Sequence, residues 1–144
     1  MRESRTVFGD CAIALHWVAC ALDSLRIRLT EYGAGLFETE QRAKPYEDLE
    51  RLGQEMDALA EQLSVTLEGE HEALVAFGSA RAAVSDVVET VGLLRDPSRH
   101  AAAGIPKLVE ETIAHVEGQR ERFDACRDQF MAATRDLPGE DSQL

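Results

Sequence analysis

The sequence predicts an all-α protein, an antiparallel bundle of three or four long helices packed through heptad-type seams. Apolar residues recur at alternating spacings of three and four over long stretches, which is the period of packed helices. No stretch alternates apolar and polar residues for long enough to predict a strand. With 144 residues, 44% of them hydrophobic, the chain can bury a core without a metal or a disulfide. We expect one domain over residues 1–135 and a disordered tail over 136–144.

The first predicted helix covers residues 6–32. Its middle, residues 11–22, is almost continuously apolar, and a helix that is apolar nearly all round is typically buried. Gly33 and Gly35 come next, and glycine is the commonest residue just after a helix end. The segment is therefore either the central helix of the bundle or a helix that buries its second face in a partner.

The next helical region is predicted to begin at Pro45, after a linker over residues 34–44, because proline favours the first helical position. Two structures fit the sequence from there to residue 95. A break of polar residues around Gly69 favours a hairpin of two helices, whereas the unbroken three-four register favours a single helix over residues 45–95. The sequence leaves both open. The seam consists of Leu49, Leu52, Met56, Leu59, Leu63, Thr66, Glu70, Ala73, Phe77, Ala80, Val84, Val87, Val91 and Leu94.

The last helix is predicted to open at Pro106 and to end by Arg135. Pro97 ends the preceding region, because a proline disfavours helical geometry at the residue before it. A short turn is expected over residues 100–104. The seam of this helix is Ile105, Val109, Thr112, Val116, Gln119, Phe123, Cys126, Phe130 and Ala133.

The net charge of −12 argues against nucleic-acid and membrane partners, because an acidic surface repels phosphates and anionic lipids. The apolar run near the N-terminus lacks a small-residue cleavage site and is too short for a membrane span, so we expect neither a signal peptide nor an anchor. Three cysteines, Cys11, Cys20 and Cys126, form no closed disulfide framework. We therefore expect reduced thiols in a cytoplasmic protein.

Motifs for catalysis are missing. The sequence has no Gly-x-Ser-x-Gly nucleophile setting and no glycine-rich phosphate loop. Paired carboxylates such as Glu110 and Glu111 lie in predicted first turns, where the helix dipole accounts for them. We expect no enzymatic activity and no cofactor.

A metal site has weak candidates on three segments. His16, Cys20 and Asp23 share one face of the first helix. The pairs Glu68–His71 and Glu111–His115 are spaced by three and four residues. Bundled di-iron proteins need a Glu-x-x-His motif from each of two helices, and here only Glu68–His71 has that spacing. The simpler interpretation makes His16 a core histidine with one hydrogen bond and leaves His71 and His115 in solvent.

The surplus of apolar residues on the first helix predicts a protein–protein interaction module, such as an adaptor, chaperone or assembly subunit, with a homodimer or a helical partner covering the surplus. The expected interaction residues are large side chains on the first helix and in the segment that follows it: Phe8, Trp17, Ile27, Phe37 and Tyr46.

Three alternative functions are compatible with the same residues. The first is a bundle that binds a metal, haem or small ligand through His16 and nearby acids, and the second is a small-molecule sensor with a pocket beside Trp17. The third is a helical substrate or chaperone similar to those of type VII secretion, since Tyr46 and Glu50 match its loose Tyr-x-x-x-Asp/Glu export pattern. The Trp-x-Gly motif of those substrates is absent, because Val18 and Ala19 come directly after Trp17.

Overall fold

A computed structural model of the chain describes residues 2–69 and 71–135, with side chains from residue 7 onward. It contains four long helices, and no strand occurs within those ranges. The predicted all-α bundle is thus confirmed, while the predicted disordered tail over 136–144 lies outside the described residues. The long helices are α1 (Arg2–Tyr32), α2 (Glu40–Thr66), α3 (Glu72–Gly92) and α4 (Ile105–Arg135), and the short 3-10 segments are η1 (Gly33–Glu38), η2 (Leu93–Arg95) and η3 (Pro97–Arg99).

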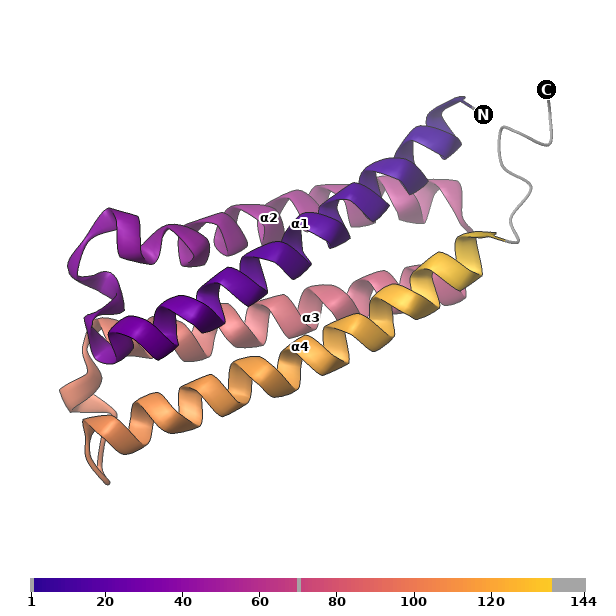
Figure 1. Cartoon of the computed structure of the whole chain (residues 1–144). Coiled ribbons are helices and arrows are strands. Elements are labelled where there is room, and N and C mark those ends of the chain that lie inside the picture. The colour runs from indigo at the N-terminus through magenta and orange to yellow at the C-terminus, as the bar shows by residue number, and fades with distance from the viewer. Residues whose placement is uncertain (1, 70, 136–144) are drawn as a thin grey trace.

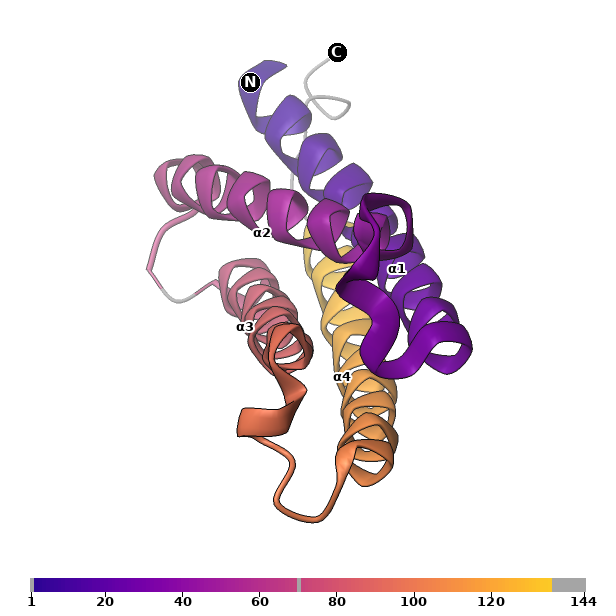
Figure 2. The ribbon, with the colours of Figure 1, turned by 90° about the vertical axis from the view of Figure 1, so that its left-hand side faces the viewer.

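The four helices lie side by side in a ring. Helix α1 packs against α2 and α4, and α3 packs against the same two neighbours. The connections α1–α2 and α3–α4 lie at one end of the molecule, and the α2–α3 connection lies at the other (Figure 1). Seen nearly end-on, the helices surround a common interior (Figure 2). Each helix therefore gives one face to the core and keeps another for solvent.

The core contains most of the predicted seam positions, but Ile105 is exposed and Val109, Gln119 and Ala133 are only half-buried. Most seam positions of α2 and α3 are buried, although Leu59 and Thr66 are only half-buried. In α4 the exposed fraction falls from 39% at Ile105 to 0% at Val116 and Phe123. The side chain of Thr112 is buried at 2% exposure and donates its hydroxyl to the Leu108 carbonyl at 2.7 Å, which satisfies its polar group locally.

The α2–α3 connection decides between the two predicted structures. Helix α2 ends at Thr66 and α3 begins at Glu72, so the single helix over residues 45–95 is wrong and the hairpin is confirmed. Gly69 has a φ of 62°, a left-handed conformation that suits glycine. Nδ1 of His71 accepts a hydrogen bond from the backbone N–H of Ala73 at 3.0 Å and caps α3. His71, expected in solvent, is therefore a half-buried capping residue.

The start of α2 differs from the prediction. The helix begins at Glu40 rather than at Pro45, because Thr39 is its N-cap and accepts a hydrogen bond from the N–H of Arg42 at 3.1 Å. Arg42 also pairs with Glu38 at 2.7 Å. Pro45 lies one turn inside the helix and is buried, so the turn before it loses one backbone hydrogen bond. The cap offsets that loss.

An aromatic cluster ties η1, α2 and η2 together at the end of the bundle where these segments meet. The rings of Phe37 and Tyr46 make an edge-to-face contact, with centroids 5.0 Å apart. The guanidinium of Arg95 lies 4.6 Å from the Phe37 centroid and 5.0 Å from that of Tyr46. The Tyr46 hydroxyl donates to the carbonyl of Val88 on α3 at 3.2 Å. Burial raises the pKa of Tyr46, and the charge of Arg95 acts in the opposite direction.

Two glycine-to-alanine substitutions are expected to have effects of opposite sign. Gly69→Ala puts a side chain on a residue with φ of 62° and is expected to cost about 1 kcal/mol of unfolding free energy. Gly118→Ala lies inside α4, where a Cβ meets no atom within 4 Å, and is expected to add about 0.5–1 kcal/mol. Urea unfolding followed by circular dichroism measures both. If both substitutions changed the unfolding free energy in the same direction, the left-handed conformation assigned to Gly69 would be wrong.

Candidate functional site

Helix α1 has a second apolar stripe on its outer surface. Ile13, Trp17 and Ile27 are exposed by 57%, 54% and 48%, and Cys20 and Ser24 lie between them on the same face. The five positions are spaced four, three, four and three, which is a heptad-type stripe. The core face of α1 is separate and carries Cys11, Leu15, Val18, Leu22, Leu25 and Leu29.

This arrangement corrects the expectation of a central helix. Helix α1 sits in the ring like the other three, and the outer half of its apolar surface faces solvent. His16, expected as a core histidine, is likewise exposed. A four-helix ring has no central position, so the surplus apolar residues of α1 could not be absorbed inside the molecule.

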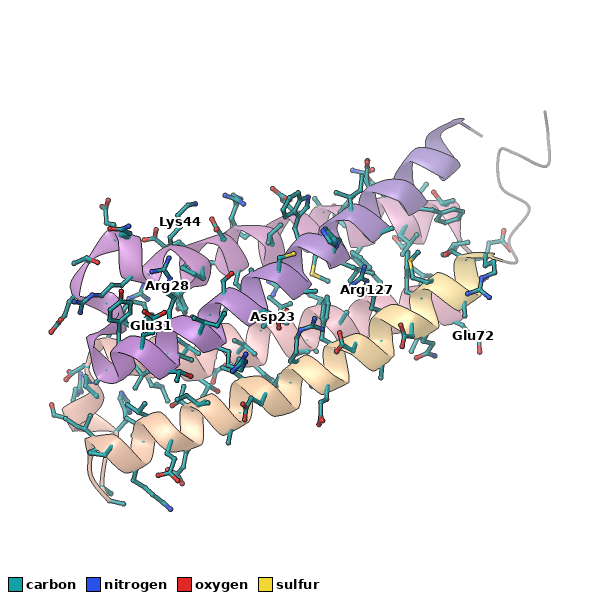
Figure 3. All side chains as sticks on the ribbon, in the orientation of Figure 1. Asp23, Arg28, Glu31, Lys44, Glu72 and Arg127 are labelled. Atoms are coloured by element: carbon teal, nitrogen blue, oxygen red, sulfur yellow. The ribbon has the colours of Figure 1, made fainter. Side chains whose placement is uncertain are left out.

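A groove borders the stripe where α1 and α2 meet. Its volume is about 610 Å³. Apolar and small side chains such as Trp17, Ala21 and Pro45 line its floor and walls. Charged residues stand along it, and Figure 3 shows Arg28, Glu31 and Lys44 close together where the two helices approach. The complete lining is Trp17, Cys20, Ala21, Ser24, Ile27, Arg28, Glu31, Lys44, Pro45, Asp48, Arg51 and Leu52.

A smaller hollow of about 350 Å³ continues the groove towards the N-terminal end of α1. It is lined by Asp10, Ile13, Ala14, Glu55, Ala58 and Leu59. The stripe, the groove and this hollow together form one surface over α1 and α2, which we call the α1–α2 face. It consists of the residues that line the two depressions.

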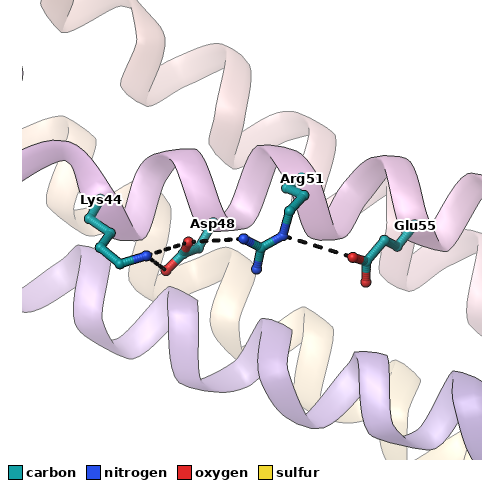
Figure 4. A network of polar contacts seen from close by, with 4 residues as sticks. All are labelled: Lys44, Asp48, Arg51 and Glu55. Atoms are coloured by element: carbon teal, nitrogen blue, oxygen red, sulfur yellow. Dashed lines mark hydrogen bonds and ion pairs between the residues drawn. The ribbon is translucent and has the colours of Figure 1, made fainter. Parts of the chain in front are cut away.

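One edge of the α1–α2 face is a row of alternating charges on α2. Figure 4 shows Lys44, Asp48, Arg51 and Glu55 in sequence along the helix. The Lys44 ammonium lies 3.1 Å from the Asp48 carboxylate, and Arg51 reaches Asp48 at 3.5 Å and Glu55 at 3.8 Å. Exposed pairs of this kind each add only about 0.3–0.5 kcal/mol to the helix. Their role in stability is therefore small, and they leave charged groups available at the surface.

The five predicted interaction residues do not lie on one surface. Trp17 and Ile27 both belong to the α1–α2 face. Tyr46 is buried at 2% exposure within the aromatic cluster, and Phe37 is half-buried beside it. Phe8 is half-buried and packs against the core. Tyr46 and Phe37 thus hold the fold together, and neither offers a free ring to another chain.

Sequence reasoning missed most of the residues around Trp17 and Ile27. Ser24, Arg28, Lys44 and Arg51 line the groove but carry no motif. The sequence does contain one indication of this surface. Ile13, Trp17 and Ile27 lie on a three-four spacing that is offset from the spacing of the core residues of α1.

The three metal candidates on α1 lie in or near the stripe but do not form a chelating group. The ring centroids of His16 and Trp17 are 5.4 Å apart, and the Cys20 sulfur lies 3.8 Å from Nε2 of His16. Asp23 points to α4, where Arg120 donates to its two carboxylate oxygens at 3.0 and 3.4 Å. The carboxylate of Asp23 is thereby committed to an interhelical ion pair.

The remaining metal candidates are separated. Glu68 is exposed in the α2–α3 turn, and the Nδ1 of His71 is engaged as a helix cap. Glu111 is exposed on α4, and His115, expected in solvent, is half-buried one turn later. Within the described ranges, no three His, Cys, Asp or Glu side chains are placed to hold one metal ion.

The three thiols occupy different environments. Cys11 is fully buried, and desolvation, with a smaller contribution from Asp10, raises its pKa to about 12. Burial also raises the pKa of Cys126, against the charge of Arg122. Cys20 is exposed on the stripe, although it lies within the most apolar run of the sequence.

Alkylation is therefore expected to be selective in the folded, dilute protein. Iodoacetamide at pH 8 should modify Cys20 while Cys11 and Cys126 react at least tenfold more slowly, because burial restricts access to those two thiols and raises their pKa. Peptide mass spectrometry over a time course measures the three rates. The three thiols should react at equal rates only after unfolding in urea. Equal alkylation rates in the native protein would contradict the burial of Cys11 and Cys126.

The segment Val7–Glu38 is long and apolar enough to cross a membrane by length and composition alone, so the expectation that the apolar run near the N-terminus is too short for a span is wrong on this criterion. Less than half of its most apolar window is buried within the bundle. Core helices of soluble proteins also meet this criterion, so the finding carries no further argument.

The α1–α2 face is thus the one described surface where exposed large apolar side chains, a groove and a row of charges coincide. Comparison with known proteins adds no constraint: no protein-family model, curated protein or solved structure matches this chain.

Proposed function

We propose that this protein is a non-enzymatic protein–protein interaction module that binds a helical partner on the α1–α2 face. The observation that carries the proposal is the outer stripe of α1, in which Ile13, Trp17 and Ile27 are each about half-exposed on one line of the helix. Large apolar side chains scattered singly are normal on protein surfaces, but a contiguous line of them beside a groove is typical of an interaction site.

The spacing of the stripe indicates the shape of the partner. Residues spaced alternately four and three apart present knobs to a second helix laid along α1. Small side chains at Ala21 and Ser24 leave space between the larger ones, and the groove beside them is about 610 Å³. Trp17 is of the residue type most often found as an interface hot spot.

The test compares capture of proteins by stripe variants. The wild-type chain, Trp17→Glu and Ile27→Glu are immobilised and exposed to a lysate that contains the same chain with a second tag. The matched control is Val65→Glu, because Val65 is 88% exposed on α2 and lies off the α1–α2 face. Captured proteins, including the second-tagged chain, are expected to be lost from both stripe variants and retained by the control. Identical capture by all four proteins would overturn the proposal.

A second candidate function is the binding of an apolar small molecule in the groove. The groove volume lies within the roughly 300–1,000 Å³ common for ligand sites, and Trp17 stands at its wall. The groove is open along its length, however, and enclosed sites bury most of a ligand. Saturable quenching of Trp17 emission by a small molecule, lost when Ala21→Leu fills the groove, would favour this candidate. Absence of any saturable quenching would eliminate it.

A further inference from the structure

We propose that the partner on the α1–α2 face is a second copy of this chain, paired about a two-fold axis that passes beside Cys20, with the two α1 helices antiparallel. This inference rests on the proposed function and specifies its partner. Three properties of the α1–α2 face support it: the face matches itself in the order of its apolar residues, it matches itself in the order of its charges, and it is long enough for a dimer interface.

The stripe on α1 reads nearly the same in both directions. Cys20 is its midpoint, Ile13 and Ile27 lie seven residues to either side, and Trp17 and Ser24 lie three and four residues from it. In an antiparallel pair centred on Cys20, Ile13 of one copy therefore faces Ile27 of the other. Trp17 faces the level of Asp23, next to the small residue Ser24 on the stripe of the other copy. A two-fold interface requires this kind of self-match, because the same patch is used by both subunits.

The groove gives the opposing indole a place to enter. Besides Ser24, its lining includes Ala21, Pro45 and Leu52, which are small or apolar, and the carboxylate of Asp48. The Trp17 ring of the second copy would be received there, while the first copy's Trp17 enters the equivalent groove. Both indoles, each 54% exposed in the single chain, are buried by this arrangement.

The charges on the face favour a copy over a strongly charged partner. The chain carries a net charge of −12, but the face has three cations against four anions, a net charge of −1. Its acidic residues are Asp10, Glu31, Asp48 and Glu55, and its basic residues are Arg28, Lys44 and Arg51. A face that is nearly neutral offers little attraction to a strongly basic partner, whereas a second copy meets little like-charge repulsion here.

The charged row on α2 is complementary to itself under the same operation. Ala21 and Leu52 line one section of the groove, while Ala14 and Leu59 line one section of the smaller hollow, so residue numbers rise along α1 as they fall along α2. The level of Cys20 on α1 therefore corresponds to that of Gly53 on α2. Arg51 and Glu55 stand on either side of this level, and the two-fold operation brings each opposite the other. Like charges would face each other in a parallel pairing.

The length of the face suits a modest but specific dimer. From Asp10 to Glu31 it extends about 32 Å along α1, and two packed helices are about 20 Å wide. This gives roughly 600 Å² per copy and about 1,200 Å² in total, at the lower end of stable interfaces. We expect a dimer that dissociates on dilution rather than a permanent one.

The first experiment measures mass against concentration. Sedimentation equilibrium of the wild-type chain should show a rise from the 15.9 kDa monomer towards twice that mass. Trp17→Ala should weaken the dimer about thirtyfold or more, as expected for a hot spot. Val65→Ala, off the face, should leave the dissociation constant unchanged. Thermal unfolding of each variant, followed by circular dichroism, checks that the fold is intact.

The second experiment tests the axis and the direction of pairing. A short bis-maleimide linker should join two wild-type chains through Cys20, and Cys20→Ser should abolish the product. In the Cys20→Ser background, Ile13→Cys and Ile27→Cys are then made separately. Each alone should give no linked dimer, because identical positions lie about 21 Å apart in an antiparallel pair. An equimolar mixture of the two should link to about half the extent of the wild type, because about half of the dimers then contain one copy of each variant and only these bring the two cysteines together.

The outcomes separate this inference from the proposed function. Linking of Ile13→Cys to itself would indicate parallel pairing and overturn the two-fold arrangement. A wild-type chain that remains monomeric at its highest soluble concentration would overturn self-association altogether. If that monomer still captures another protein through Trp17 and Ile27, the proposed function survives with a different partner. If it captures nothing, both fail.

Discussion

Val91→Asp is expected to cost at least about 4 kcal/mol of unfolding free energy and to leave the chain largely unfolded at 37 °C. Val91 is fully buried on α3 and belongs to the core cluster, where a carboxylate has no water. The substitution removes the transfer free energy of the valine and adds a desolvated charge without a partner. Domains of this size are stable by about 5–15 kcal/mol, so such a loss removes most of the stability of a domain at the lower end of this range. Urea denaturation followed by circular dichroism measures it.

The control for this variant is Val75→Asp on the same helix. Val75 is 52% exposed and lies in the first turns of α3, where a negative charge interacts favourably with the helix dipole. Its effect is expected to stay within about 0.5 kcal/mol. A Val91→Asp protein with the cooperative transition of the wild type would contradict the packing of α3.

Phe77→Ala and Phe130→Ala are each expected to cost about 3–5 kcal/mol, because both rings are fully enclosed and their removal leaves cavities. The two rings join α3 to α4, with centroids 5.6 Å apart and planes tilted by 49°. In a double-mutant cycle measured by urea unfolding, the pair should show a coupling of about 0.5–1.5 kcal/mol, because each ring is part of the other's environment.

Met131→Ala serves as the control for the phenylalanine pair. Met131 is the neighbour of Phe130 on α4 but is 41% exposed, so its truncation is expected to change stability by about 0.5 kcal/mol or less. The cycle is best measured in a stabilised background, for which Gly118→Ala is available. If the losses of unfolding free energy in the two single variants simply added in the double variant, the two rings would not interact.

The fold class could be predicted because the apolar residues that a helix buries in the core recur at spacings of three and four in the sequence. Phe77, Val84 and Val91 recur at seven-residue intervals and are all buried. The hairpin could not be settled in the same way, because a heptad register that resumes in phase looks alike in one long helix and in two short ones. What decides it is the geometry at Gly69 and the cap from His71, and neither changes the hydrophobic pattern.

The start of α2 could not be predicted for a related reason. Pro45 is a common first residue of helices, but Thr39 offers a side-chain oxygen to the free N–H groups of the first turn. Local preference alone ranks both starts as good. The additional turn also brings Arg42 to within 4.3 Å of the Tyr32 ring centroid, a contact between segments that no local pattern predicts.

The candidate site could be predicted only in part. Trp17 and Ile27 stand out as surplus apolar residues on α1, because a bundle helix needs only one apolar face. Tyr46 and Phe37 are also large and apolar, but their rings pack against each other at the end of the bundle and do not lie on this surface. The groove depends on how α1 and α2 lie together, and therefore on residues far apart in sequence, such as Ala21 and Leu52.

The ring of four helices has a consequence for the order in which the protein can be completed. Of the four described helices, α4 leaves the ribosome after the other three, yet it covers surfaces of both α1 and α3, and the pair between Asp23 and Arg120 joins residues 97 positions apart. Until residues 105–135 leave the ribosome, the nascent chain holds two uncovered apolar surfaces at once. Chains that terminate before residue 105 should therefore be clients of chaperones and proteases, whereas chains that contain α4 can bury both surfaces.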